Sequence, residues 1–309
     1  MKIFSINLIK NKKRIWLFSS LLIALSFIGI LTSSFNPSVN KPINLGMDYV
    51  GGNEIRLERK CIPNCDKLTS DEIIEELINI DNDRNFINNI RLQIQNENSL
   101  ISIRTPYLSL EKSEKLISDM NKIIGPINFD SLISRSIGPK LGRDLLVNGA
   151  ISLLFSLLAI SIYISIRFDR KFSLLALSAL FHDLIIVFGI FSWLGLIFSV
   201  EVNILFAVAL LTIAGYSVND TVVIFDRIRE NLKTNPNQNY NKIIELSVND
   251  SLRRTIFTSL TTLIPLLTLI FLGSYSLFWF SIALTLGILI GSYSSILLAP
   301  SLLIKDEIS

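Results

Sequence analysis

An acidic residue, Asp220, lies inside a long apolar segment of this 309-residue chain. The segment Val202–Phe225 has the composition of a membrane-spanning helix, and an ionised carboxylate near the middle of such a helix costs about 2.5–3.5 kcal/mol. Side chains of this kind usually mark pathways for ions or protons. The sequence therefore predicts an ion-coupled or proton-coupled role for Asp220.

Arg254 is the expected partner of Asp220. It follows Arg253 at the start of a later apolar segment, and Asp220 lies about one and a half helical turns inside the polar boundary on the same side. Arg254 can reach a similar depth on a neighbouring helix, which favours an Asp220–Arg254 pair. The alternative is that Arg254 extends to the lipid headgroups while Asn219 and hydroxyl groups hold Asp220.

More polar groups accompany these two residues. Hydroxyl side chains at the start of the fifth apolar segment either bond their own backbone carbonyls or hydrate a proton route. They are Thr255, Thr258, Ser259, Thr261 and Thr262. His182 and Asp183 lie near the middle of the third segment, and histidine titrates near neutral pH. These two residues either take part in proton transfer or form a structural polar contact between helices.

The sequence gives no sign of other chemistry. It contains no Gly-x-x-x-x-Gly-Lys-Ser/Thr loop, so we do not expect it to hydrolyse ATP. Two cysteines and one histidine cannot supply the usual four-ligand zinc site. The small formal net charge of +3 does not point to nucleic acid. We expect no catalytic residue, metal or cofactor, and an ion gradient as the energy source, worth about 2.3 kcal/mol per charge and 100 mV.

The apolar segments predict a polytopic α-helical membrane protein. Half of the residues are hydrophobic and the mean hydropathy is positive, and a bilayer needs roughly 20 apolar residues per helix. Six stretches meet this need: Ile15–Ser34, Leu145–Ile166, Phe172–Phe198, Val202–Phe225, Thr255–Leu272 and Leu277–Ile304. We interpret the first as an anchor rather than a cleaved signal peptide, because its apolar part is long and no small-x-small cleavage site is obvious.

The distribution of Lys and Arg predicts the orientation of the six spans. Basic residues precede the first span, follow the second, lie in the loop at about 226–253 and follow the sixth, whereas Ser199–Glu201 and Gly273–Ser276 have none. Residues 1–14 and 305–309 are therefore expected in the cytoplasm, with spans at 15–34 and within 145–304. Residues 35–144 are expected to form an extracytoplasmic domain.

This domain alternates between strand-like and helical patterns. The strands are expected at Glu54–Arg59, Asn89–Gln95, Leu100–Thr105 and Ile127–Ser134, with helices from Thr69 to about Ile80 and from Ser109 to before Gly125. This β-α-β-β-α-β order predicts a small α+β domain of the ferredoxin-like kind. Cys61 and Cys65 face the oxidising side, and they are either disulfide-bonded or two unpaired loop thiols.

Several motifs lie beside or within the predicted spans. They are Asn44–Asn53 after the first span, Ser136–Pro139 before the second, Arg167-Phe168 after it, His182-Asp183 in the third, Gly215–Asn231 in the fourth and Arg254–Thr262 in the fifth. Together they resemble the SecF family of bacterial protein-export subunits, in the resistance-nodulation-division superfamily. The similarity runs from about Gly46 to Pro300. The segment with Cys61 and Cys65 departs from the family pattern, and Tyr49 replaces a more usual phenylalanine.

The resemblance implies a function in the bacterial inner membrane. It implies a partner, SecD, with six further spans, and association with the Sec channel (SecY, SecE and SecG) and accessory membrane subunits. Asp220 and Arg254 match the family's proton-pathway positions, and proton flow would move outer domains that pull or release preproteins. A competing hypothesis is a proton-driven exporter of small molecules or lipids. A third is a structural scaffold, which the cost of burying Asp220 disfavours.

Overall fold

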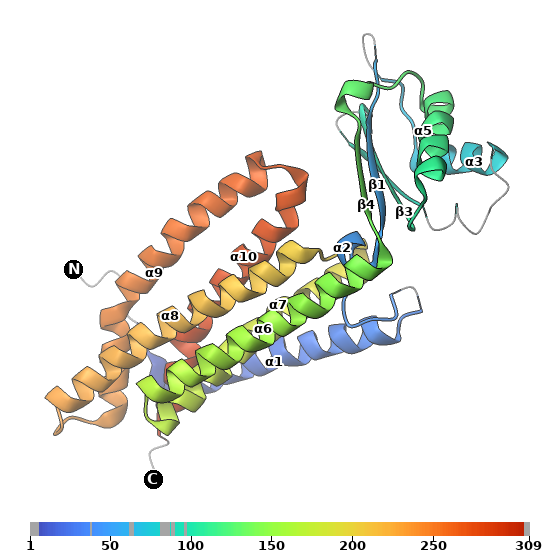
Figure 1. Cartoon of the computed structure of the whole chain (residues 1–309). Helices are drawn as coiled ribbons and strands as arrows, with labels where there is room; N and C mark the ends of the chain where they lie inside the picture. Colours follow the sequence, from blue (N-terminus) through green and yellow to red (C-terminus); the bar gives the residue numbers. More distant parts are fainter. Residues whose placement is uncertain are drawn as a thin grey trace. The chain divides into compact units, whose positions relative to one another are not determined.

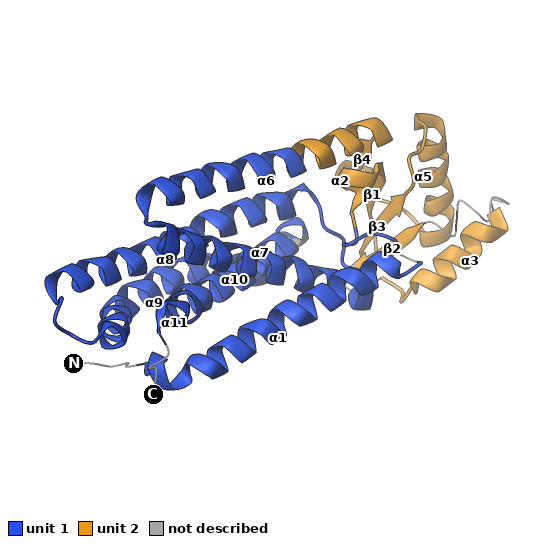
Figure 2. Cartoon of the chain, turned by 90° about the horizontal axis from the view of Figure 1, so that it is seen from below, with its two compact units in different colours: residues 1–44, 149–309 blue, residues 45–148 orange. Residues whose placement is uncertain are grey.

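The computed structural model describes residues 6–37, 39–61, 65–80, 87, 90–95 and 98–305. The chain divides into two compact units, which Figure 2 shows in different colours. The helical unit contains residues 1–44 and 149–309, and the α+β unit contains residues 45–148.

Six helices of the described chain are long and apolar enough to cross a membrane (Figure 1). They are α1 (Leu8–Phe35), α6 (Pro139–Arg167), α7 (Arg170–Phe198), α8 (Ile204–Thr234), α9 (Tyr240–Leu272) and a last helix made of α10 (Tyr275–Tyr293), the π-helical turn η2 (Ser294–Leu298) and α11 (Ala299–Leu303). These helices confirm the predicted polytopic fold. Several extend beyond the apolar stretches, and polar caps help to set their ends: the side chain of Asn239 accepts hydrogen bonds from the N–H groups of Asn241 and Lys242.

Glycines allow the helices of the helical unit to pack closely. Gly189 of α7 lies against Ser26 of α1, and Gly287 of α10 lies against the side chain of Ile213 on α8. A Cβ atom at either glycine would overlap its neighbour. Gly287 and Gly291 form a Gly-x-x-x-Gly pattern in the last span, and both lie against α8, at Ile213 and Ser217. Such patterns commonly allow membrane helices to pack closely.

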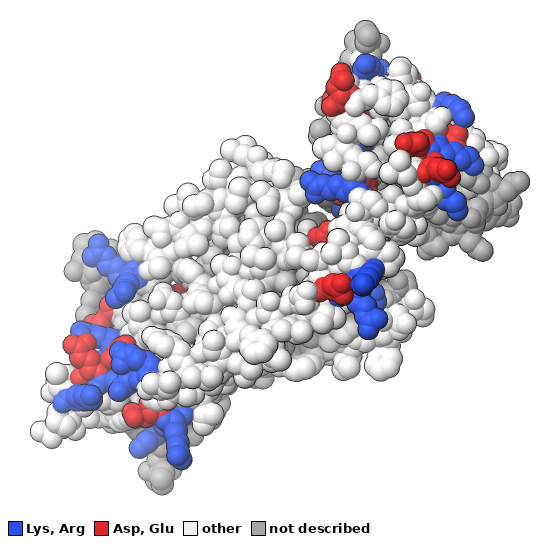
Figure 3. Space-filling view, viewed as in Figure 1, with Lys and Arg blue, Asp and Glu red and all other residues white. Residues whose placement is uncertain are grey.

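Both ends of the described chain lie at the same end of the helical unit. The side chain of Asn249 on α9 bonds the backbone N–H and C=O of Ile6 at 2.7 and 3.1 Å, and that of Asn241 bonds the backbone of Lys305 at 3.0 and 2.9 Å. Figure 3 shows charged side chains gathered at one end of this unit and an almost uncharged surface next to them. An even number of spans accounts for this arrangement.

The α+β unit is built on a four-stranded antiparallel sheet. Its elements are α2 (Met47–Val50), β1 (Gly52–Glu58), α3 (Ser70–Ile80), β2 (Arg91–Gln95), β3 (Leu100–Thr105), α5 (Leu110–Ile124), the 3-10 turn η1 (Phe129–Ser131) and β4 (Ile133–Ile137). The strand order is β2-β3-β1-β4, which is the predicted ferredoxin-like arrangement. Alternate residues of the central strands form its core with the two helices, and Ile55, Ile103, Ile73 and Met120 are fully buried there.

Local hydrogen bonds explain where the α+β unit follows the sequence prediction and where it does not. The helix predicted from Thr69 begins with a capping box: the Glu72 carboxylate accepts from the Thr69 N–H at 2.8 Å, and the Thr69 hydroxyl oxygen accepts from the Glu72 N–H at 3.3 Å. These bonds hold the pKa of the Glu72 carboxyl below its usual value. The last strand begins at Ile133 rather than at Ile127, which forms only an isolated bridge with Arg59 before η1 interrupts the extended chain. The expected strand residue Asn89 lies outside the described residues.

The segment that follows α1 is bonded to the helical unit. The Lys41 carbonyl accepts a hydrogen bond from Ser33, the Pro42 carbonyl accepts one from Ser192, and the Asn44 carbonyl accepts one from Val202 N–H, at 2.8, 2.7 and 2.9 Å. These bonds hold the segment to the helical unit. The compact α+β unit begins after this segment, at Leu45, and ends inside α6 at Asn148.

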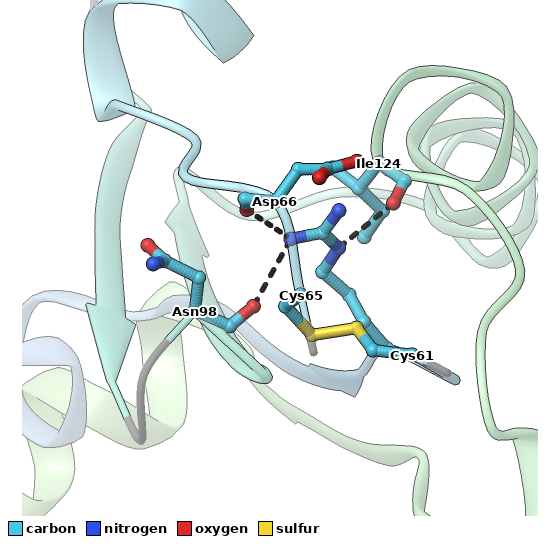
Figure 4. Close-up of a disulfide and its surroundings, with 6 residues drawn as sticks. Cys61, Cys65, Asp66, Asn98 and Ile124 are labelled. Carbon is cyan, nitrogen blue, oxygen red and sulfur yellow. Dashed lines mark hydrogen bonds between the residues drawn. A yellow bond between two sulfur atoms is a disulfide. The ribbon is translucent and has the colours of Figure 1, made fainter. Parts of the chain in front are cut away.

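A disulfide joins Cys61 to Cys65, with 4.9 Å between their Cα atoms (Figure 4). The neighbouring Arg59 donates hydrogen bonds to the carbonyl oxygens of Ile124, Asp66 and Asn98 at 2.8, 3.0 and 3.2 Å. The arginine thereby ties the disulfide loop to the end of α5 and to the β2–β3 turn. The cysteine pairing that the sequence left open is thus a bond within one short loop.

Candidate functional site

Asp183 is fully buried where α7, α8 and the π-turn meet. One oxygen, Oδ2, accepts hydrogen bonds from the hydroxyls of Ser217 at 2.6 Å and Ser294 at 2.7 Å, and Oδ1 lies 2.9 Å from Nδ1 of His182. Two serine hydroxyls therefore donate to this carboxyl group, and a histidine ring nitrogen lies within hydrogen-bond distance of it. Asp183 therefore connects the three helical segments.

The π-turn places a second hydroxyl against α8. Ser295 lies 2.8 Å from the hydroxyl of Thr221, and both side chains donate to the backbone carbonyl of Ser217, at 3.3 and 3.1 Å. Turns of this kind are rare and often occur at functional sites. The α8 segment next to Asp220 is thus held by a network of serine and threonine hydroxyls.

Asp220 has the opposite environment. Its side chain is only 3% exposed, and its Oδ2 atom has no hydrogen-bond partner in the described chain. The same holds for the buried hydroxyl of Thr255 and for Nε2 of His182. A buried carboxylate without hydrogen bonds is costly, whereas the neutral acid costs less. This environment suits a carboxyl group that takes up and gives back a proton.

The expected direct ion pair between Asp220 and Arg254 is absent from the described structure. The side chain of Arg254 is exposed, and its positive charge acts on Asp220 electrostatically without a contact. The reason is the angular step between successive helical residues, because Thr255, the next residue, takes the inward position on α9 and is 1% exposed. One part of the alternative is also wrong, since Asn219 is exposed and no hydroxyl of the described residues bonds Asp220. The exposure of Arg254 agrees with its other part, in which Arg254 extends to the lipid headgroups.

The hydroxyls of α9 fall into two groups. Thr258 donates to the carbonyl of Arg254, while Thr261 and Thr262 both donate to that of Thr258, at 2.7, 2.8 and 3.0 Å. Ser259 donates to the carbonyl of Thr255 and also lies 2.6 Å from the hydroxyl of Ser292 and 3.3 Å from that of Tyr216. Only the inward residues Thr255 and Ser259 are therefore placed to serve a polar route through the bundle.

Several site residues were missed by the sequence analysis. They are Tyr216, Ser217, Thr221, Ser292, Ser294 and Ser295. A usable signal is present, because all six carry hydroxyls within otherwise apolar spans, but hydropathy alone does not show which of them face the interior. No cluster of metal-ligating side chains occurs among the described residues.

Comparison with known proteins extends the sequence resemblance. Residues 117–307 match the family described as protein export membrane protein SecD/SecF, C-terminal. The protein translocase subunit SecF of Prochlorococcus marinus is 47% identical, over 97% of this chain and 95% of its own length. The SecF subunit of a Synechocystis strain is 36% identical, over 96% of this chain and 93% of its own.

A solved structure shares the fold. The crystal structure of SecDF, a translocon-associated membrane protein from Thermus thermophilus, matches 98% of this chain with a TM-score of 0.78 and 30% identity. This chain spans 38% of that SecDF chain. A second SecDF structure, in a super-membrane-facing form, matches with a TM-score of 0.65. From these matches over nearly its full length, the chain belongs to the SecD/SecF family of protein-export membrane proteins, with SecF subunits as its full-length relatives.

Proposed function

We propose that this chain is an accessory subunit of the Sec protein-export machinery that works with SecD and uses the proton gradient to promote late steps of preprotein translocation. The proposal rests mainly on the burial of the Asp220 carboxyl group. The Oδ2 atom of this buried carboxyl group has no hydrogen-bond partner among the described residues. Inside a membrane-spanning helix, that burial has a cost that a purely structural role does not explain. The family membership supports export as the work to which the proton is coupled.

Proton exchange at Asp220 changes its attraction to Arg254. The ionised carboxylate attracts the guanidinium group, and the neutral acid does not. Arg254 lies on α9 and Asp220 on α8, so the two charge states favour different distances between these helices. Asp183 and its hydroxyl partners hold α7, α8 and the π-turn together, which provides a fixed frame for this movement.

Helix α6 is suited to carry such a movement to the α+β unit. At one end Arg167 forms an ion pair of 2.7 Å with Asp226 of α8. At the other end, Gly142 packs so closely on the backbone of Tyr49 and Gly51 that a Cβ atom would lie 2.9 Å from both. Burial there, together with the charge of Asp48, raises the pKa of Tyr49 to about 12. Helix α6 thus contacts α8 through Arg167 and packs on the backbone of Tyr49 and Gly51 through Gly142.

The proposed setting is the bacterial inner membrane with both termini in the cytoplasm. SecD, the Sec channel and unfolded preproteins are the proposed partners. The exposure of Asn219 on α8 supports a helical partner, because an amide facing lipid has no hydrogen-bond partner there. The apolar window of α6 has no buried residue within this chain, which also leaves a helix surface for another subunit.

Export into membrane vesicles with an imposed proton gradient tests the coupling. We expect Asp220→Asn to abolish the gradient-dependent part of export while the protein remains in the membrane. Glu230→Gln is the matched control, because it removes one carboxylate from the exposed polar end of the same helix. Normal gradient-dependent export by the Asp220→Asn variant would rule out the proton route.

The exporter hypothesis predicts a different outcome. A protein that exports small molecules or lipids has no need of Sec subunits. Recovery of the chain from membranes without SecD or channel subunits, under conditions in which they remain intact, would count against the Sec proposal. Recovery of a stable complex with SecD would count against the exporter.

A further inference from the structure

Strand β4 forms an open edge of the sheet in the α+β unit. In the described chain β4 pairs only with β1, and Ile133, Ser134, Arg135 and Ser136 are all exposed. The outer side of an edge strand presents backbone N–H and C=O groups that can bond another extended chain. Native proteins usually protect such an edge unless they use it.

A row of charged side chains crosses the sheet and ends at this edge. Arg91 of β2 lies opposite Arg104 of β3, and Glu54 of β1 lies between Arg104 and Arg135 of β4. Directly opposed residues share one face of a sheet, so all four belong to the same face. The row therefore contains three arginines and one glutamate.

Glu54 is already engaged by two other arginines. Its Oε1 atom lies 3.1 Å from Arg56 and 3.5 Å from Arg104. Arg135 also lies opposite Glu54 in the strand register, yet it is exposed and has no ion pair with any described residue. The edge strand thus presents a cation to a chain that would lie beside it.

Apolar side chains flank this cation on the same face. Successive residues of a strand alternate between faces, so Ile133 and Ile137 lie on the face of Arg135. Ile133 is 46% exposed although it is a large apolar side chain. The edge therefore presents an arginine between two isoleucines, together with the backbone N–H and C=O groups on the outer side of β4.

We propose that β4 binds an extended, unfolded polypeptide segment as a fifth strand, with an acidic side chain beside Arg135 and apolar side chains beside Ile133 and Ile137. The backbone of the segment bonds the outer side of β4, and the alternating side chains give selectivity. An unfolded chain fits because its backbone groups are not already paired in a fold. The identification of this segment as a preprotein rests on the proposed function.

The other edge of the sheet is a weaker candidate. On the same face β2 presents Arg91 and Gln93, without an exposed isoleucine. In contrast, β4 is followed by Gly138 and then by α6, which begins at Pro139. A chain bound at β4 therefore lies one residue from the helix that joins the two units.

Binding of short labelled peptides to the full chain in lipid nanodiscs tests this proposal. The probe alternates valine and threonine around a central glutamate, and its partner probe has lysine in place of the glutamate. We expect Arg135→Glu to weaken binding of the glutamate probe about fivefold and to strengthen binding of the lysine probe, in line with an exposed ion pair. Arg91→Glu, on the opposite edge strand, should change neither.

Two N-methylated glutamate probes test the strand geometry. Each carries N-methyl groups on alternate residues, one on the odd positions and one on the even positions, so that only one of them blocks the edge facing β4. Loss of binding by one probe and retention by the other supports strand addition. Equal binding by both, or no effect of Arg135→Glu, would overturn the proposal. Since no gradient is needed, these outcomes are independent of proton coupling at Asp220.

Discussion

Asp183 and Asp220 are buried carboxyl groups in neighbouring helices with opposite surroundings. The carboxyl group of Asp183 accepts hydrogen bonds from two serine hydroxyls and lies next to the His182 ring. In contrast, Oδ2 of Asp220 has no hydrogen-bond partner among the described residues. The first arrangement ties helices together. The second leaves one carboxyl oxygen without such ties. We therefore propose that Asp183 belongs to the frame and that Asp220 exchanges the proton.

Thermal unfolding of two matched variants separates these roles. Asp183→Asn replaces an oxygen acceptor with an amide donor that faces other donors, so we expect a loss of about 1–3 kcal/mol and a lower Tm. Asp220→Asn removes a charge but no hydrogen bond, so its Tm should equal or exceed that of the unchanged protein. A similar loss of stability in both variants would contradict this assignment.

The sequence located both carboxyl groups but not their partners. A charge in an apolar run is visible in the composition. Which neighbour faces inward depends on an angular step of about 100° per residue and on the packing of the other helices. Asn219 and Arg254 therefore point away from the position that the sequence analysis gave them, and Thr255 occupies the interior instead.

Helices and strands follow the sequence patterns more closely than single side chains do. Hydropathy located all six spans, and alternation with capping signals predicted the strand order of the α+β unit. The short helix α2, the turn η1 and the π-turn were not predicted, and the last two have no sequence signal of their own. The turn η1 continues an alternating pattern after Ile127, and the π-turn Ser294–Leu298 has the same composition as an α-helical turn. Their hydrogen bonds are set by tertiary packing.

The glycine contacts give a test at the level of helix packing. Gly189→Ala places a methyl group against the backbone and side chain of Ser26 on α1, so we expect α1 to shift and stability to fall by about 1–3 kcal/mol. Gly215→Ala is the matched control, because a Cβ atom there meets nothing within 4 Å. Unfolding in detergent should show a lower midpoint for the first variant alone. Equal midpoints would contradict the close α1–α7 contact.

At the scale of the molecule, both described chain ends and the α6–α7 connection are bonded to other helices of the helical unit. The backbone at Ile6 and Lys305 is bonded to α9, and Arg167 links the α6–α7 connection to α8. Asn237 in the α8–α9 connection and Ser274 in the α9–α10 connection are both exposed. With six spans these two connections face opposite sides of the membrane.

Cysteine labelling of intact cells tests the proposed orientation. In a chain with Cys61→Ser and Cys65→Ser, a membrane-impermeant maleimide should modify Ser274→Cys directly. The Asn237→Cys variant should react only after the membrane is made permeable, because the basic connections are expected in the cytoplasm. The reverse labelling pattern would contradict the orientation, and labelling of both sites in intact cells would contradict the number of spans.

The central claim is that proton exchange at Asp220 drives the export contribution of this chain. The most direct measurement is the gain in preprotein export when a proton gradient is imposed on vesicles that contain the chain with SecD and the Sec channel. We predict a clear gain with the unchanged protein and none with Asp220→Asn, at equal amounts of both in the membrane. An equal gain with both proteins would contradict the claim.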